Sequence, residues 1–167
     1  NFIQNGNDVI LVEADEFDRS FLTLNPNISC ITSVDSDHLD VYNSNSELQK
    51  SFNEFASKLE LNGVLFKHYD VPIDGVSYGF NKNAEYSIIN YRNDESSTFF
   101  DIVYEKENSI NVKFNMPGKH NACNAFVAFA SGRLLKINDE QIVNSLNTFK
   151  GVKRRFSYIL RSPKILI

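Results

Sequence analysis

Two short runs of apolar residues lie near the start of the chain, and each leads directly into polar residues. The first run covers residues 8–12 and is followed by the acidic segment Glu13–Asp18; the second covers residues 28–34 and is followed by the polar segment 35–40. Uninterrupted apolar runs of this length are typical of strands that are buried on both faces of a parallel sheet. Ligands of open α/β sheets bind beyond the carboxyl ends of the strands, so both polar segments are candidate binding segments.

The spacing of apolar residues becomes helical between Ser46 and Leu61, where they recur every three or four positions. Ser46 can cap the start of this helix, and Asn62-Gly63 can end it. Val64–Phe66 then predicts a third buried strand, which completes a β–α–β unit. The fold predicted for this part is α/β, with a mostly parallel sheet flanked by helices.

The pattern is β-rich from about residue 76 to residue 116, and polar turns separate its strands. This arrangement predicts a small antiparallel meander attached to the α/β part. The strands predicted are Tyr86–Tyr91, Thr98–Tyr104 and Ile110–Phe114. After Pro117-Gly118 the pattern predicts helices over His120–Leu135 and Asp139–Phe149, and then two short strands, Phe156–Leu160 and Lys164–Ile167.

Composition and charge narrow the function classes. The chain has 167 residues, of which 42% are hydrophobic, and this share excludes a wholly disordered chain. Its 17 basic and 21 acidic residues give a net charge of −4, which disfavours a general nucleic-acid binder. No apolar run approaches the roughly 18 residues that a membrane span needs. The two cysteines, Cys30 and Cys123, suit a reducing compartment, so we expect a cytoplasmic protein.

The acidic segment Glu13–Asp18 is a candidate metal site. Mg²⁺ prefers carboxylate oxygens and takes one or two of them from the protein. Glu13 lies nearest the end of the predicted strand and is therefore the best-placed ligand. The alternative is structural: these carboxylates solvate a loop, and Asp18 caps the next short helix.

His38 lies among acidic residues just beyond the second predicted strand. A neutral imidazole can bind a metal ion or contact a phosphate, and carboxylates next to it in the chain can orient it. The alternative is an imidazole that is simply solvated in a polar loop.

The start of the helix predicted from His120 carries two amides, Asn121 and Asn124, three residues apart and therefore on one side of the helix. The paired donor and acceptor of an Asn side chain match the N6/N7 edge of adenine. Helix capping by Asn is the alternative.

A local cluster of cations lies in Gly151–Phe156, where Arg155 offers a planar guanidinium suited to phosphate. A solvated basic turn is the alternative. Neither a G-x-x-x-x-G-K-[ST] phosphate loop nor a G-x-G-x-x-G motif occurs in the chain, so a nucleotide site here is absent or incomplete.

Taken in order, these segments resemble the central ATP-binding domain of the Mur ligases, whose core is of the phosphate-loop type. The likeness lies in the segments Val12–Asp18 with Ser20–Leu22, Asp37–Tyr42, Pro117–Ala125 and Gly151–Phe156. The residues of these motifs are most similar to those of the branch that adds L-alanine to UDP-N-acetylmuramate in peptidoglycan synthesis. The murein-peptide ligases of the same family and a non-catalytic nucleotide-binding or interaction module remain alternatives.

The resemblance implies a role for each candidate residue. Glu13 and His38 would act at the reaction centre and bind Mg²⁺. His120, Asn121, Asn124 and Arg155 would bind ATP. The implied partners are ATP, UDP-N-acetylmuramate and L-alanine, with no nucleic acid and no membrane.

Two departures from the family pattern bear on activity. Several relatives carry a carbamylated lysine at the place where this chain has Phe55. The absence of the lysine agrees with the alanine-adding branch. The phosphate loop is missing, and we expect residues 1–167 to be a single truncated central domain, with the loop and a UDP-binding domain upstream and another domain downstream. The 167 residues alone are therefore expected to be inactive.

Overall fold

The computed structural model describes residues 2–5, 9–34, 42, 44–105 and 108–151. The chain divides into two compact units, Asn1–Val76 and Ser77–Ile167. The strands predicted at Phe156–Leu160 and Lys164–Ile167 lie outside the described residues. No helix in the described part is long and apolar enough to cross a membrane.

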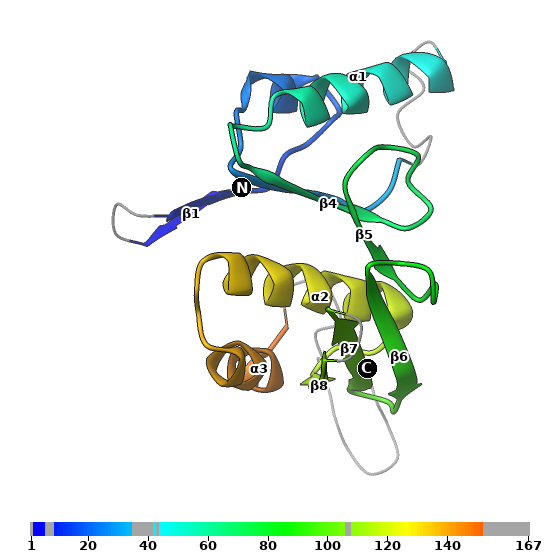
Figure 1. The fold of residues 1–167 in the computed structure, drawn as a ribbon, viewed down its shortest axis with the longest axis vertical. Helices are drawn as coiled ribbons and strands as arrows, with labels where there is room; N and C mark the ends of the chain where they lie inside the picture. Colours follow the sequence, from blue (N-terminus) through cyan, green and yellow to red (C-terminus); the bar gives the residue numbers. More distant parts are fainter. Residues whose placement is uncertain (1, 6–8, 35–41, 43, 106–107, 152–167) are drawn as a thin grey trace. The chain divides into compact units, whose positions relative to one another are not determined.

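The first unit contains the predicted β–α–β arrangement (Figure 1). Strands β3 (Ile28–Ile31) and β4 (Val64–His68) pair in parallel, and helix α1 (Asn45–Ser57) lies between them in the sequence. The helix begins earlier than predicted because Ser44, not Ser46, caps it by accepting the N–H of Glu47 at 3.3 Å. It ends at Ser57, before the predicted Leu61.

The core of the first unit lies between α1, the parallel pair and the short 3-10 helix η1 (Ser20–Thr23). Phe21 of η1 packs against Phe55 of α1 with ring centroids 5.2 Å apart. The buried members of this core are Phe21, Ile31, Phe55, Leu65, Val71 and Ile73. The acidic segment enters η1, so this packing anchors the end of that segment.

The first apolar run does not form the predicted buried parallel strand. Strand β2 (Val9–Val12) instead pairs antiparallel with β1 (Phe2–Asn5). Ile10 and Leu11 are each 64% exposed. The predicted burial and the predicted parallel pairing were both wrong, because an apolar, β-branched composition favours a strand but does not determine which strands lie beside it. Within the described residues, β2 pairs with a local hairpin partner.

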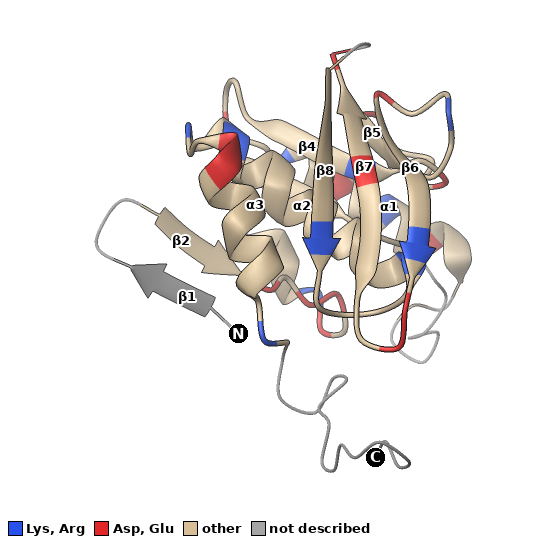
Figure 2. Cartoon of the chain, turned by 90° about the horizontal axis from the view of Figure 1, so that it is seen from below, with Lys and Arg blue, Asp and Glu red and all other residues tan. Residues whose placement is uncertain are grey.

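The second unit carries the predicted meander. Strand β6 (Tyr86–Asn93) pairs antiparallel with β7 (Thr98–Tyr104), and β7 pairs antiparallel with β8 (Asn108–Phe114). A short strand that the pattern did not resolve, β5 (Val76–Gly79), pairs in parallel with β6. Figure 2 shows the strands of the meander side by side. Asp101 lies on β7, Arg92 on β6 and Lys113 on β8. The α/β class with a small antiparallel meander is confirmed.

Two helices pack on one face of the meander, close to the predicted bounds: α2 (Lys119–Leu134) and α3 (Asp139–Thr148). The β7 strand alternates between buried and half-buried residues, as expected for a strand with one covered face. Phe126 and Phe129 of α2 are fully buried, and Phe126 stacks on Tyr78 with centroids 4.4 Å apart. This packing holds the middle of α2 in the core of the second unit.

Candidate functional site

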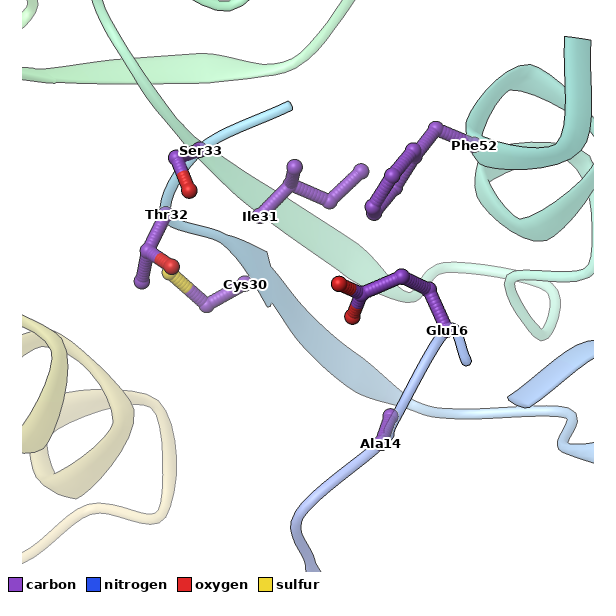
Figure 3. A pocket seen from close by; sticks show the side chains of 7 residues that line it. All are labelled: Ala14, Glu16, Cys30, Ile31, Thr32, Ser33 and Phe52. Carbon is purple, nitrogen blue, oxygen red and sulfur yellow. The ribbon is translucent and has the colours of Figure 1, made fainter. Parts of the chain in front are cut away.

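A pocket of about 130 Å³ lies at the carboxyl end of β3 in the first unit. Its walls come from the end of β3, from the acidic segment and from α1, and the carboxylate of Glu16 points into it (Figure 3). The residues that line it are Ala14, Glu16, Cys30, Ile31, Thr32, Ser33 and Phe52. The pocket therefore joins two of the segments that the sequence singled out, at the end of a parallel strand where α/β proteins bind ligands.

Two carboxylates of the acidic segment are engaged in local backbone structure. Oδ1 of Asp15 accepts the N–H of Phe17, and Oδ1 of Asp18 accepts the N–H of Ser20, each at 2.9 Å. The bonds from Ser20 hold the pKa of Asp18 below its usual range. Asp18 thus satisfies the first N–H of η1, which is the structural role considered for it from the sequence.

Glu16, and not Glu13, contributes its side chain to the pocket. Glu13 follows β2 directly and is exposed. The sequence argument favoured Glu13 because it is nearest a strand end, but that strand is β2, which does not pair with β3 in the described part of the chain. The assignment of Glu13 to a metal therefore stays a prediction.

Tyr42 was quoted from the sequence only as part of a motif, yet it is fully buried beside the acidic segment. Its hydroxyl donates to the backbone carbonyl of Glu16 at 2.6 Å. Burial is the main cause that raises the pKa of Tyr42, so the hydroxyl keeps its proton and remains a donor. Sequence spacing alone carried no signal for this contact, because it joins residues 26 positions apart.

The start of α2 carries three of the predicted nucleotide-binding residues. His120 is exposed, and Asn121 and Asn124 are half-buried on the same side of the first turns. Nδ2 of Asn121 donates to the carbonyl of Pro117 at 2.7 Å, so part of this amide holds the chain that enters the helix. Asn124 makes no side-chain hydrogen bond with the residues that the structure describes.

His38 and Arg155 lie outside the described residues, so their predicted roles stay predictions. Among the residues that are described, no three His, Cys, Asp or Glu side chains gather closely enough to hold a metal ion.

Comparison with known proteins identifies what the chain is similar to. Residues 2–132 match the family model of the Mur ligase middle domain. The chain is 46% identical over 167 residues to the UDP-N-acetylmuramate–L-alanine ligase of Christiangramia forsetii, and 45% identical over 166 residues to that of Flavobacterium psychrophilum. These matches cover 100% and 99% of this chain, which spans 37% of the length of each relative.

Solved structures show the same fold at lower identity. A UDP-N-acetylmuramate–alanine ligase from Thermotoga maritima superposes with a TM-score of 0.80 at 23% identity, over 92% of this chain and 36% of the other. A MurF from Acinetobacter baumannii gives 0.71 at 20% identity, over 88% and 34%. A MurF ligase from Thermotoga maritima, in complex with ADP, gives 0.68 at 16% identity, over 84% and 34%.

Proposed function

This chain belongs to the Mur ligases, and we propose that it supplies the ATP-binding part of an enzyme that joins L-alanine to UDP-N-acetylmuramate in peptidoglycan precursor synthesis. The observation that carries the proposal is the identity to curated L-alanine ligases along the whole chain. Use of ATP is general in the family. A cytoplasmic location is part of the proposal, because a chain with two cysteines suits a reducing compartment.

In the proposed reaction, a carboxylate oxygen of UDP-N-acetylmuramate attacks the γ-phosphorus of ATP, which forms an acyl-phosphate and releases ADP. The amine of alanine then attacks the acyl carbon, so a C–N bond forms, the acyl C–O bond breaks, inorganic phosphate leaves, and the proton of the amine passes to water. The protein contributes positioning and neutralisation of charge, which are the main sources of catalysis in phosphoryl transfer.

The acidic segment fits Mg²⁺ better than a metal that needs a complete protein cage. Mg²⁺ is commonly held by one or two carboxylates, with water and phosphate as its other ligands. The acidic segment Glu13–Asp18 offers carboxylates of this kind. We assign Glu13 and His38 as its ligands; when bound, the ion neutralises charge on the phosphates.

We assign the nucleotide to His120, Asn121, Asn124 and Arg155. An Asn amide has two N–H groups and one carbonyl oxygen. The bond from Asn121 to Pro117 uses one N–H and fixes the plane of the amide, which leaves the other N–H and the oxygen for the adenine edge. Asn124, one helical turn along, offers a second amide on the same side.

The test uses the full-length protein that contains this chain, supplied with MgATP and UDP-N-acetylmuramate. We expect phosphate release that depends on L-alanine, together with a product heavier by one alanyl residue in mass spectrometry. Release that depends on a peptide instead of alanine would favour a murein-peptide ligase. Absence of both activities would favour a non-catalytic module.

Variants of the same protein separate the two assigned sites. Asn124→Ala should raise the KM for ATP about tenfold by removing a hydrogen-bonding pair, whereas Asn144→Ala, on the exposed side of α3, should leave it unchanged. Glu13→Gln should raise the Mg²⁺ concentration that gives half-maximal activity, and Glu140→Gln should not. Equal effects within either pair would contradict the assignment.

A second experiment concerns the missing phosphate loop. We expect residues 1–167 to bind MgATP weakly in calorimetric titration and to release no phosphate. The same chain extended upstream through the phosphate loop should bind more tightly, because backbone amides and a lysine then cradle the phosphates. Equal affinity of the two forms would overturn the placement of the nucleotide.

A further inference from the structure

Tyr42 is fully buried, and its hydroxyl hydrogen-bonds to the backbone of the acidic segment. It donates to the carbonyl of Glu16 at 2.6 Å, at the short end of the range for such bonds. Loss of this hydroxyl would remove one of the two hydrogen bonds that the Glu16 carbonyl accepts, in surroundings where water replaces it poorly.

The same tyrosine supports a strained turn in the acidic segment. The carbonyl of Glu16 also accepts the N–H of Arg19 at 3.1 Å, which closes a turn whose last residue has φ 60°. A left-handed conformation is unfavourable for a residue other than glycine, so other contacts must hold it. The guanidinium of Arg19 lies 4.9 Å from the centroid of the Tyr42 ring, and its Nη2 lies 3.5 Å from Oε2 of Glu47.

We infer that Tyr42 is a positioning residue that holds the acidic segment in place at the pocket. Its contact is with the backbone of Glu16, whose carboxylate lines the pocket (Figure 3). A shift of that carbonyl moves the Glu16 side chain and the segment that begins at Glu13. The inference rests on the proposed function only in giving this segment a metal to bind. The clamp, by which we mean the contacts of Tyr42 with the Glu16 carbonyl and with Arg19, follows from the structure.

Tyr42→Phe tests the clamp because it removes one oxygen and keeps the ring under Arg19. The matched control is Tyr91→Phe, whose hydroxyl also bonds within the protein, to Oδ1 of Asn93 at 3.2 Å, but at an exposed site in the second unit. The first readout is hydrogen–deuterium exchange of residues 15–20 in this chain. We expect exchange to be faster by roughly tenfold in Tyr42→Phe and unchanged in the control.

The second readout is the Mg²⁺ dependence of the full-length protein. We expect Tyr42→Phe to raise the half-maximal Mg²⁺ concentration by roughly fivefold to tenfold, with an unchanged KM for L-alanine. A purely structural role would lower the thermal midpoint and leave the Mg²⁺ dependence of the folded enzyme unaltered. Arg19→Lys keeps the positive charge and removes the planar guanidinium that lies over the Tyr42 ring. It should shift both readouts in the same direction, by less, and it serves if Tyr42→Phe does not fold.

The outcomes separate the inference from the proposed function. Unchanged exchange of residues 15–20 in folded Tyr42→Phe overturns the clamp, whatever the enzyme does. Faster exchange with an unchanged Mg²⁺ dependence overturns the link between the clamp and the metal-binding segment. If the unaltered full-length protein forms no product, the proposed function fails, and the exchange experiment still decides whether Tyr42 positions the segment.

Discussion

Thr98 offers a sharp test of how the meander holds the segment that leads into α2. Its side chain is fully buried on β7, and its Oγ1 donates to the carbonyl of Met116 at 2.7 Å. Thr98→Val keeps the branched shape and replaces the hydroxyl by a methyl group. The substitution therefore removes one donor from a buried carbonyl and changes little else.

The expected cost follows from two opposing effects. A buried carbonyl that loses its partner costs about 1–3 kcal/mol. The added methyl group returns up to about 0.8 kcal/mol of burial energy. We therefore expect Thr98→Val to lower the free energy of unfolding by about 1–2 kcal/mol.

Thr148→Val is the matched control, because Oγ1 of Thr148 donates to the carbonyl of Asn144 at 2.8 Å on the exposed side of α3. Water can replace that bond, so the change should stay within about 0.5 kcal/mol. Urea unfolding followed by far-ultraviolet circular dichroism suits a chain that has no tryptophan. The midpoint should fall for Thr98→Val with an unchanged m-value. Equal stabilities of the two variants would refute the reasoning.

Three further predictions concern other parts of the chain. Phe55→Ala, in the core of the first unit, should lower the free energy of unfolding by about 3–5 kcal/mol in urea titration, and a loss below about 1 kcal/mol would contradict the packing. Arg133→Met removes the 3.1 Å contact from Nε to Oδ1 of Asp139 and the cation–π contact 4.1 Å above the Tyr104 ring. Because both ionic groups are partly exposed, we expect the free energy of unfolding to fall by only about 1 kcal/mol, and by less in 1 M salt. A decrease that does not depend on salt would argue against the ion pair. Burial raises the pKa of Cys123 from 9.0 to about 11, so the folded state retains a proton that the unfolded state releases, and stability should fall as the pH rises from 9 towards 11. Cys123→Ala should flatten this part of the measured pH dependence, and an unchanged slope would contradict the burial.

Most of the regular structure could be predicted because it depends on local spacing. The β-rich pattern between polar turns predicted β7 (Thr98–Tyr104) with its bounds, and the pattern after Pro117-Gly118 predicted the start of α3 at Asp139. Prediction failed for Val9–Val12, where the composition favours a strand but the burial depends on which segments lie beside it. At the candidate site, Asp18 was correctly considered as a cap because its bond spans two residues.

The α/β class, most of the helices and strands and the family resemblance could be derived from the sequence, because propensity, periodicity and motifs are properties of neighbouring residues. Folding in three dimensions was needed to place Glu16 in the lining of the pocket and the Tyr42 hydroxyl against the carbonyl of Glu16. These contacts join segments distant in the chain, and they form only when the core around Phe21 and Phe55 brings those segments together. A hydrogen bond between such segments depends on three-dimensional packing, which spacing along the chain does not encode.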